Sequence, residues 1–299
     1  MRCMPPRRAG AIGCAGGTEH DSVAARPGAE AGRARGGRQL ATANAPHGTG
    51  DIPVTFYSQF AEYYEAVFPY RDEVAAFLRS YVPDGSRRIL DAGCGTGHYC
   101  GRLAADGFDV VGIDLDPRMI DVARQTYPAA TFRCLNMLDV GTLAGSFDFV
   151  FCIGNVAPHL TQAEFARFAG DVANILRPGG VWIFQVVNWD YVLTHGAYAF
   201  RPRKLGSGGA VFLREYREIS DSRVRFLTRL VAEDRTIFEG DVWLYPLRTD
   251  AYVRLHRERG FELLEHFADF QRTPYATTSD AGSVFAFRAR RTAESARVA

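Results

Sequence analysis

The chain has 299 residues, of which 47% are hydrophobic and 23% charged, and its formal net charge at pH 7 is +1. It lacks the basic excess typical of nucleic-acid-binding proteins, and no apolar run reaches the roughly 18 residues that a membrane-spanning helix needs. Its six cysteines form no CxxC pair and no zinc-ligand spacing, so we expect neither a metal site nor a disulfide framework. This use of cysteine fits a reducing compartment, so we expect a cytoplasmic protein.

Residues 1–50 differ from the rest of the chain in composition. They are rich in Gly, Ala, Pro and Arg and contain no aromatic residue. Such a segment buries too little apolar surface to offset the entropy of ordering, so we predict a disordered tail. A transit peptide and a misassigned start codon are the alternatives. Residues 51–299 are then the folded domain, with residues 195–247 as an inserted substrate cap.

Helical spacing of apolar residues begins at 56–67 and recurs over 72–81, and from there short apolar runs alternate with helical segments. Strands are predicted at 88–91, 109–114, 131–135, 147–153 and 181–187, with helices from 97, from 117 and over 161–176. This alternation favours an α/β fold with a doubly wound, mostly parallel sheet that is covered on both faces.

After residue 187 the pattern changes to β-rich segments separated by short polar turns. Three antiparallel strands are predicted at 210–218, 223–233 and 236–247. A helix over 250–259 and strands at 261–266 and 283–288 would then complete a seven-stranded sheet. The arginines of the inserted segments either attract an anionic substrate or form a solvated face, paired with acids such as Glu215, Glu218 and Glu233. They are Arg214, Arg217, Arg223, Arg225 and Arg229.

The run Asp91-Ala-Gly93-Cys-Gly95-Thr-Gly97 joins the first strand of this sheet to a helix. Glycines let the backbone approach a ligand closely, and a helix start offers free N–H groups. The spacing is GxGxG, whereas dinucleotide-binding proteins have GxGxxG, so an NAD(P) oxidoreductase is disfavoured. Asp91 would repel a pyrophosphate but can accept hydrogen bonds from an ammonium group.

Polar residues also follow the next two strands. Asp114 ends the second strand, where an acid can accept hydrogen bonds from both hydroxyls of a ribose. Asn136 follows the third strand and carries the donor and acceptor needed to read an adenine edge, and Met137 offers a soft apolar face. A ligand with an amino group, a free ribose and adenine but no pyrophosphate is S-adenosylmethionine.

The glycine run, Asp114 and the segment Leu176-Arg-Pro-Gly-Gly180 together resemble the class I S-adenosylmethionine-dependent methyltransferases. The similarity covers about residues 56–187 and implies a Rossmann-like methyltransferase fold. It also implies a cofactor site, including an arginine for the cofactor carboxylate. The implied cofactor-binding residues are Arg71, Asp91, Gly93, Gly95, Gly97, Asp114, Leu115, Asn136, Met137 and Ile153.

Within that family, residues 147–160 and 188–193 resemble glycine N-methyltransferases. In those enzymes an arginine that holds the amino-acid carboxylate lies just before the Asn-aromatic-Asp-Tyr run. Val187 stands at that place here, so glycine is not indicated as the acceptor, and N- or O-methylation of a small molecule stays open.

Methyl transfer from a sulfonium is an in-line displacement, for which the protein mainly aligns the reactants and excludes water. Asn155 and His159 follow the fourth strand and are the candidate catalytic residues, Asn155 to orient the acceptor and His159 as a base. His159 could equally brace the next helix, and the tyrosines near residue 60 could form a lid or belong to the core. The predicted substrate contacts are Tyr57, Tyr64, Asn155, Asn188 and Tyr191.

Two other functions are known for this architecture or compatible with it. An aminopropyltransferase needs acids after the fourth strand to hold a polyamine, and residues 153–156 supply none. A non-catalytic module that only binds S-adenosylmethionine would share the fold and the glycine turn, and turnover would distinguish it from an enzyme. The expected partner is a small-molecule acceptor, and binding to nucleic acid or to a membrane is not expected. The sequence does not indicate the oligomeric state.

Overall fold

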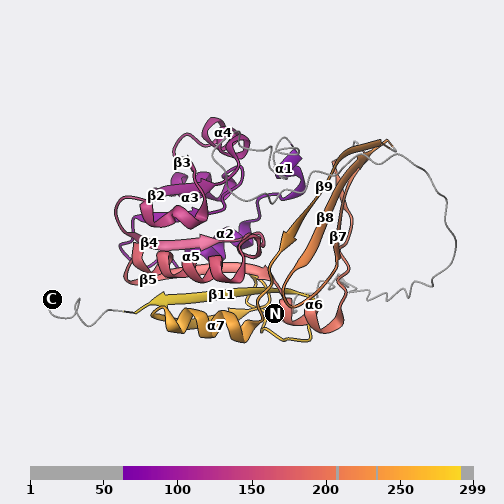
Figure 1. Cartoon of the computed structure of the whole chain (residues 1–299). Helices are drawn as coiled ribbons and strands as arrows, with labels where there is room; N and C mark the ends of the chain where they lie inside the picture. Colours follow the sequence, from indigo (N-terminus) through magenta and orange to yellow (C-terminus); the bar gives the residue numbers. More distant parts are fainter. Residues whose placement is uncertain (1–62, 207–208, 234, 291–299) are drawn as a thin grey trace, which may run out of the picture. The chain divides into compact units, whose positions relative to one another are not determined.

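The structure, a computed structural model, describes residues 63–206, 209–233 and 235–290. Its main sheet contains, in spatial order, β10 (Phe261–Phe267), β11 (Gly282–Ala289), β5 (Leu176–Val187), β4 (Phe147–Cys152), β1 (Arg88–Ala92), β2 (Asp109–Asp114) and β3 (Thr131–Cys134) (Figure 1). Strands β1 to β5 pair in parallel, and β11 runs antiparallel to β5 and β10.

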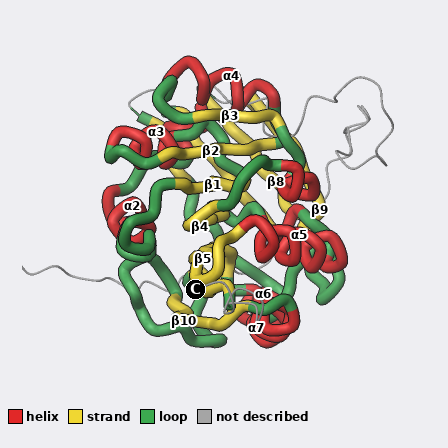
Figure 2. Tube along the Cα trace, turned by 90° about the vertical axis from the view of Figure 1, so that its left-hand side faces the viewer, coloured by secondary structure: helices red, strands yellow, loops and turns green. Residues whose placement is uncertain are grey.

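Helices cover both faces of this sheet (Figure 2). Successive strand residues point to opposite faces, so Ile89 packs in one core with Phe77 while Leu90 packs in another with Phe168. The first core receives α2 (Asp72–Arg79), α3 (His98–Ala105) and α4 (Pro117–Thr126), and the second receives α5 (Gln162–Ile175) and α7 (Thr249–Glu258). Both faces of the strands are therefore apolar, as the continuous hydrophobic runs predicted.

A second, antiparallel sheet is inserted between α6 (Trp189–His195) and α7. Its strands, in spatial order, are β6 (Arg203–Leu205), β7 (Ala210–Arg217), β8 (Val224–Ala232) and β9 (Arg235–Leu244). The predicted fold class, a seven-stranded mostly parallel sheet with an antiparallel insertion, is confirmed. The prediction of three inserted strands missed β6, because an edge strand of three residues has no readable alternation.

Two further elements differ from the sequence prediction. Helix α6 was not predicted, because it has only seven residues and depends on Asn188, whose side chain accepts a hydrogen bond from the Tyr191 N–H at its start. Strand β5 begins at Leu176 instead of residue 181, and a register shift against β4 accommodates the Arg-Pro-Gly-Gly run at 177–180.

The N-terminal predictions are covered only in part. Of the helix predicted over 56–67, the described portion forms α1 (Tyr64–Val67). The tail predicted over 1–50 and its boundary with the domain lie outside the described residues, as does Tyr57.

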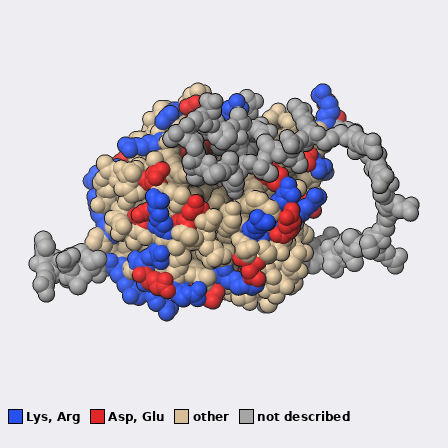
Figure 3. Space-filling model, in the orientation of Figure 1, with Lys and Arg blue, Asp and Glu red and all other residues tan. Residues whose placement is uncertain are grey.

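The surface carries charges of both signs. On the face shown in Figure 3, basic and acidic side chains are interspersed, in keeping with the near-neutral net charge. No helix in the described ranges is long and apolar enough to cross a membrane.

Candidate functional site

The loops that follow β1 to β5 lie at one edge of the sheet, because the carboxyl ends of parallel strands meet there. The turn after β1 folds onto the end of β2. The N–H groups of Gly93 and Cys94 donate to the Ile113 carbonyl at 2.8 and 2.9 Å, and the Gly95 N–H donates to Asp114 Oδ2 at 2.9 Å. The structure thus brings together the glycine turn and the acid of the second strand.

The side chain of Tyr64 covers the glycine turn. A Cβ added at Gly95, where φ is +54°, would lie 2.9 Å from the Tyr64 ring. Helix α1 is held at this place by Glu65, whose Oε1 accepts hydrogen bonds from Thr96 Oγ1 at 3.0 Å and from the Tyr127 hydroxyl at 3.2 Å. No sequence pattern indicated Glu65, because its partners lie more than 30 residues away along the chain.

Asp91 presents an uncompensated carboxylate oxygen. The residue is only 3% exposed, and its Oδ2 accepts a weak hydrogen bond from Cys100 Sγ at 3.4 Å. Its Oδ1 is buried and has no hydrogen-bond partner among the described residues. Burial raises the pKa of Asp91 to about 8. An ammonium group that donates to Oδ1 would remove this deficit, so Asp91 fits the amino end of the expected cofactor.

Asp114 is half-buried at the end of β2. Its oxygens accept hydrogen bonds from the N–H groups of Gly95 and Asp116, both at 2.9 Å, and burial raises its pKa to about 6. Each carboxylate oxygen keeps a lone pair that can accept from a ribose hydroxyl. Leu115, which follows it, is 51% exposed.

The residues predicted at adenine lie after β3. Asn136 precedes the 3-10 helix η2 (Met137–Thr142), and its Oδ1 accepts from the Leu138 N–H at 2.9 Å. Its amide group is thereby oriented, with the Nδ2 donors left for a ligand. Met137 is half-buried against the core, as is Ile153 after β4.

Arg71 and two unpredicted polar groups lie near the start of α3. Arg71 is exposed, forms an ion pair with Glu73 at 3.5 Å, and through its charge opposes the burial that raises the pKa of Tyr99. His98 Nδ1 and the Tyr70 hydroxyl are both buried without a hydrogen-bond partner in the described part of the chain. The two rings lie 6.4 Å apart. His98 directly follows the glycine run, and this position could have indicated His98 as a site residue from the sequence.

Asn155 connects β4, β5 and the inserted sheet. It adopts a left-handed backbone conformation with φ of +62°, its Oδ1 accepts from the Val187 N–H at 2.9 Å, and its Nδ2 donates to the Tyr216 hydroxyl at 3.4 Å. His159 ends the 3-10 helix η3 (Ala157–His159), and burial lowers its pKa to about 4. His159 is therefore uncharged at neutral pH and would be a weak base.

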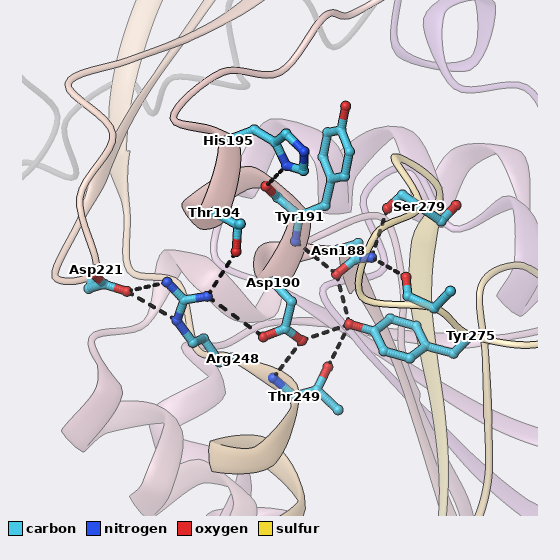
Figure 4. A network of polar contacts seen from close by, with 11 residues as sticks. Asn188, Asp190, Tyr191, Thr194, His195, Asp221, Arg248, Thr249, Tyr275 and Ser279 are labelled. Atoms are coloured by element: carbon cyan, nitrogen blue, oxygen red, sulfur yellow. Dashed lines mark hydrogen bonds and ion pairs between the residues drawn. The ribbon is translucent and has the colours of Figure 1, made fainter.

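Asn188 lies at the centre of a polar network (Figure 4). It is fully buried, and its Nδ2 donates to the Ala276 and Ser279 carbonyls at 2.9 and 2.8 Å. Its Oδ1 receives hydrogen bonds from the Tyr191 N–H and the Tyr275 hydroxyl. A substrate contact by Asn188 would require one of these bonds to break.

Tyr191 lies on the exposed side of this network (Figure 4). Its ring is half-buried and stacks on His195, with centroids 4.1 Å apart. It lies 6.5 Å from the Tyr198 ring, which joins the aromatic cluster of the inserted sheet. Tyr191 is thus placed where α6 meets the inserted segment.

Comparison with known proteins gives a consistent result. The family model described as "Methyltransferase domain" matches residues 89–180. A glycine/sarcosine N-methyltransferase of Parasynechococcus marenigrum is 31% identical over 210 residues, which are 66% of this chain and 70% of the relative. A glycine/sarcosine/dimethylglycine N-methyltransferase of Actinopolyspora halophila is 28% identical over 68% of this chain, which spans 36% of that longer protein.

Solved structures agree on the fold. The CcbJ methyltransferase of Streptomyces caelestis superposes with a TM-score of 0.68 at 22% identity, covering 80% of this chain and 100% of that chain. At this identity the likeness concerns the fold alone.

Proposed function

The chain belongs to the class I S-adenosylmethionine-dependent methyltransferase family, and we propose that it methylates a nitrogen atom of a small molecule. It is a methyltransferase, with S-adenosylmethionine as its methyl donor. The preference for nitrogen rests on the relative of 31% identity, which is named for N-methylation of glycine and sarcosine.

The cofactor assignment rests on Asp91 Oδ1, which is buried and has no hydrogen-bond partner in the described structure. Asp91 would hold the ammonium group, Asp114 the ribose hydroxyls and Asn136 the adenine edge. When bound, the cofactor supplies an electrophilic methyl group on a sulfonium sulfur. Tyr64, which lies over the glycine turn, would exclude water from this end of the site.

On the acceptor side, Asn155 and His159 would shape the site without strong acid–base chemistry. The Asn155 amide ties the end of β5 to Tyr216, so it would fix the position of the acceptor wall. Because burial keeps His159 uncharged, it would add no positive charge to repel an amine or a sulfonium.

Turnover tests the proposal. Purified protein is incubated with methyl-labelled S-adenosylmethionine and a metabolite extract, and S-adenosylhomocysteine and new labelled products are measured by mass spectrometry. We expect a labelled N-methyl product that an Asp91→Asn variant forms far more slowly. Cofactor binding without any product would instead favour a non-catalytic binding module, and a labelled O-methyl product would contradict the preference for nitrogen.

A further inference from the structure

Arg214 is directed into the molecule from the inserted sheet. On β7, alternate residues Phe212, Arg214 and Tyr216 share one face, and both aromatic residues are buried. Arg217 lies on the opposite face, where it forms an ion pair with Glu215 at 2.8 Å. The Nε of Arg214 is buried and has no hydrogen-bond partner within the described ranges.

A second arginine lies beside it. Arg203 on β6 is directly opposite Phe212, which makes it a diagonal neighbour of Arg214 on the same face. One of its N–H groups, on Nη1, donates to the Val67 carbonyl at 2.6 Å. Burial, followed by the charge of Arg203, lowers the pKa of Arg214 to about 10, so the charge of Arg203 disfavours the protonated form of Arg214.

No acid compensates this pair in the part of the chain that the structure describes. Other arginines of the inserted sheet do have carboxylate partners, as Arg225 has in Asp241 at 2.7 Å and Arg229 in Glu239 at 3.4 Å. Arg214 instead lies over the Phe200 ring, 4.7 Å from its centroid, and its Nη2 reaches the Arg201 carbonyl only at 3.4 Å. Two neighbouring cations without a carboxylate partner favour an anion from outside.

The pair is connected to both ends of the candidate site by direct contacts. From Arg214 the contacts pass to Phe200 and then to Tyr216, whose ring centroid lies 4.8 Å from that of Phe200 and whose hydroxyl contacts Asn155. From Arg203 they pass to Phe68, 5.6 Å from the guanidinium carbon, and then to Tyr64 over the glycine turn.

We propose that Arg203 and Arg214 bind an oxyanion, a carboxylate or a phosphate, carried by the methyl acceptor. The proposal rests on the proposed function, because it assigns the acceptor's second functional group. Guanidinium groups suit this task, since their planar donors match both anions. The aromatic rings around Arg214 would then contact the acceptor's carbon skeleton.

A binding experiment tests the anion site without requiring turnover. Thermal unfolding is followed in sodium benzoate, in sodium phosphate and in sodium chloride at equal ionic strength, with and without S-adenosylhomocysteine. We expect benzoate or phosphate to raise Tm by about 2–4 °C above chloride, and the effective salt identifies the anion class. Arg214→Met and Arg203→Met should lose this shift, whereas Arg217→Met, on the other face of β7, should keep it.

The site is refuted if neither anion shifts Tm more than chloride, or if Arg214→Met responds like the unmodified protein. Failure of the proposed function gives a different result, because calorimetry would then detect no S-adenosylhomocysteine binding while the anion shifts persist.

Pairs of acceptors that differ in the anionic group then test whether the two arginines bind the methyl acceptor. Glycine is compared with glycinamide, and phosphoethanolamine with ethanolamine, by the rate of S-adenosylhomocysteine formation. In the pair that is methylated, the acceptor with the carboxylate or phosphate is the informative one. For this acceptor, Arg214→Met should raise KM roughly tenfold or more with little change in kcat, as expected for loss of a charged hydrogen bond. An equal rise in KM for the member that lacks the carboxylate or phosphate, or preferred methylation of such members, would contradict the role in acceptor binding.

Discussion

At the scale of single residues, burial determines the protonation of Asp91, the proposed partner of the cofactor's ammonium group. Its carboxyl is almost fully buried, its strongest protein contact is a thiol, and its pKa is about 8. Without a cation the group is mostly protonated at pH 7, and an ammonium partner would draw it into the ionised form.

We therefore predict that cofactor binding at pH 7 releases about one proton from Asp91, and that at pH 9, above its pKa, it releases almost none. Calorimetry of S-adenosylhomocysteine binding in two buffers of different ionisation enthalpy measures this number. The Asp91→Asn variant should bind more weakly and show no such release. The same release in the variant would place the proton elsewhere.

Asp114 fixes the glycine turn through the Gly95 N–H, and in the proposed cofactor site it would also accept hydrogen bonds from the ribose. Asp114→Ala should weaken S-adenosylhomocysteine binding by about 1.5–3 kcal/mol, the loss expected for hydrogen bonds to a charged group. The control is Asp121→Ala, an exposed acid on α4 whose ion-pair partner among the described residues is Arg124. Titration calorimetry compares them, and equal affinities of the two variants would refute the role of Asp114.

At the scale of elements, the glycine turn and α3 depend on close packing against β3. Gly97 has φ of +82°, and a Cβ at this position would lie 2.6 Å from the Phe132 ring. Its backbone conformation and its lack of a side chain are therefore both required.

Gly97→Ala should lower the free energy of unfolding by about 2–4 kcal/mol, from left-handed strain together with overpacking. Gly107→Ala separates the two effects, because Gly107 has φ of +94°, while no atom of the described structure beyond its two chain neighbours lies within 4 Å of the added Cβ. It should cost only about 1 kcal/mol. Chemical denaturation measures both, and similar losses would mean that contact with Phe132 is unimportant.

Helix α6 is held by tertiary contacts that converge on Tyr275. The Tyr275 hydroxyl lies 2.7 Å from Asp190 Oδ2 and 2.9 Å from Thr249 Oγ1, so it joins α6 to α7 (Figure 4). Its ring stacks on His266 with a centroid distance of 3.9 Å.

Tyr275→Phe keeps the ring but removes the hydrogen bonds of its hydroxyl with Asp190, Thr249 and Asn188, so it should destabilise the protein by about 1–3 kcal/mol. Cofactor affinity should change less than twofold, because the network lies outside the glycine turn. Denaturation and calorimetry give the two values, with Tyr63→Phe, at an exposed tyrosine, as the control. A stability loss no greater than that of the control would show that the network adds nothing.

For the whole molecule, the site draws on loops from several strands, so a bound cofactor should stabilise the entire domain. At about 100 times its Kd, S-adenosylhomocysteine should add about 2.7 kcal/mol and raise Tm by roughly 5–10 °C. NADH should give no shift, because its pyrophosphate cannot form with Asp91 the charge-assisted hydrogen bond that an ammonium group forms. A shift with NADH and none with S-adenosylhomocysteine would overturn the cofactor assignment.

The order of strands and helices could be read from the sequence, because hydrophobic periodicity and glycine spacing are local properties of the chain. The closeness of the glycine turn to Asp114 could also be expected, since successive parallel strands bring their ends together, whereas the hydrogen bond from the Gly95 N–H to Asp114 was not predicted. The short elements β6 and α6 could not be predicted, because packing and capping stabilise them more than their own few residues do.

Only the tertiary structure determined which polar groups have partners. Among the described residues, Asp91 Oδ1 and Arg214 Nε have no hydrogen-bond partner, whereas the amide of Asn188 is fully hydrogen-bonded by residues far away in the chain. Burial and hydrogen bonding are set by these distant neighbours, so the sequence names the candidate residues while the fold decides which remain available to a ligand.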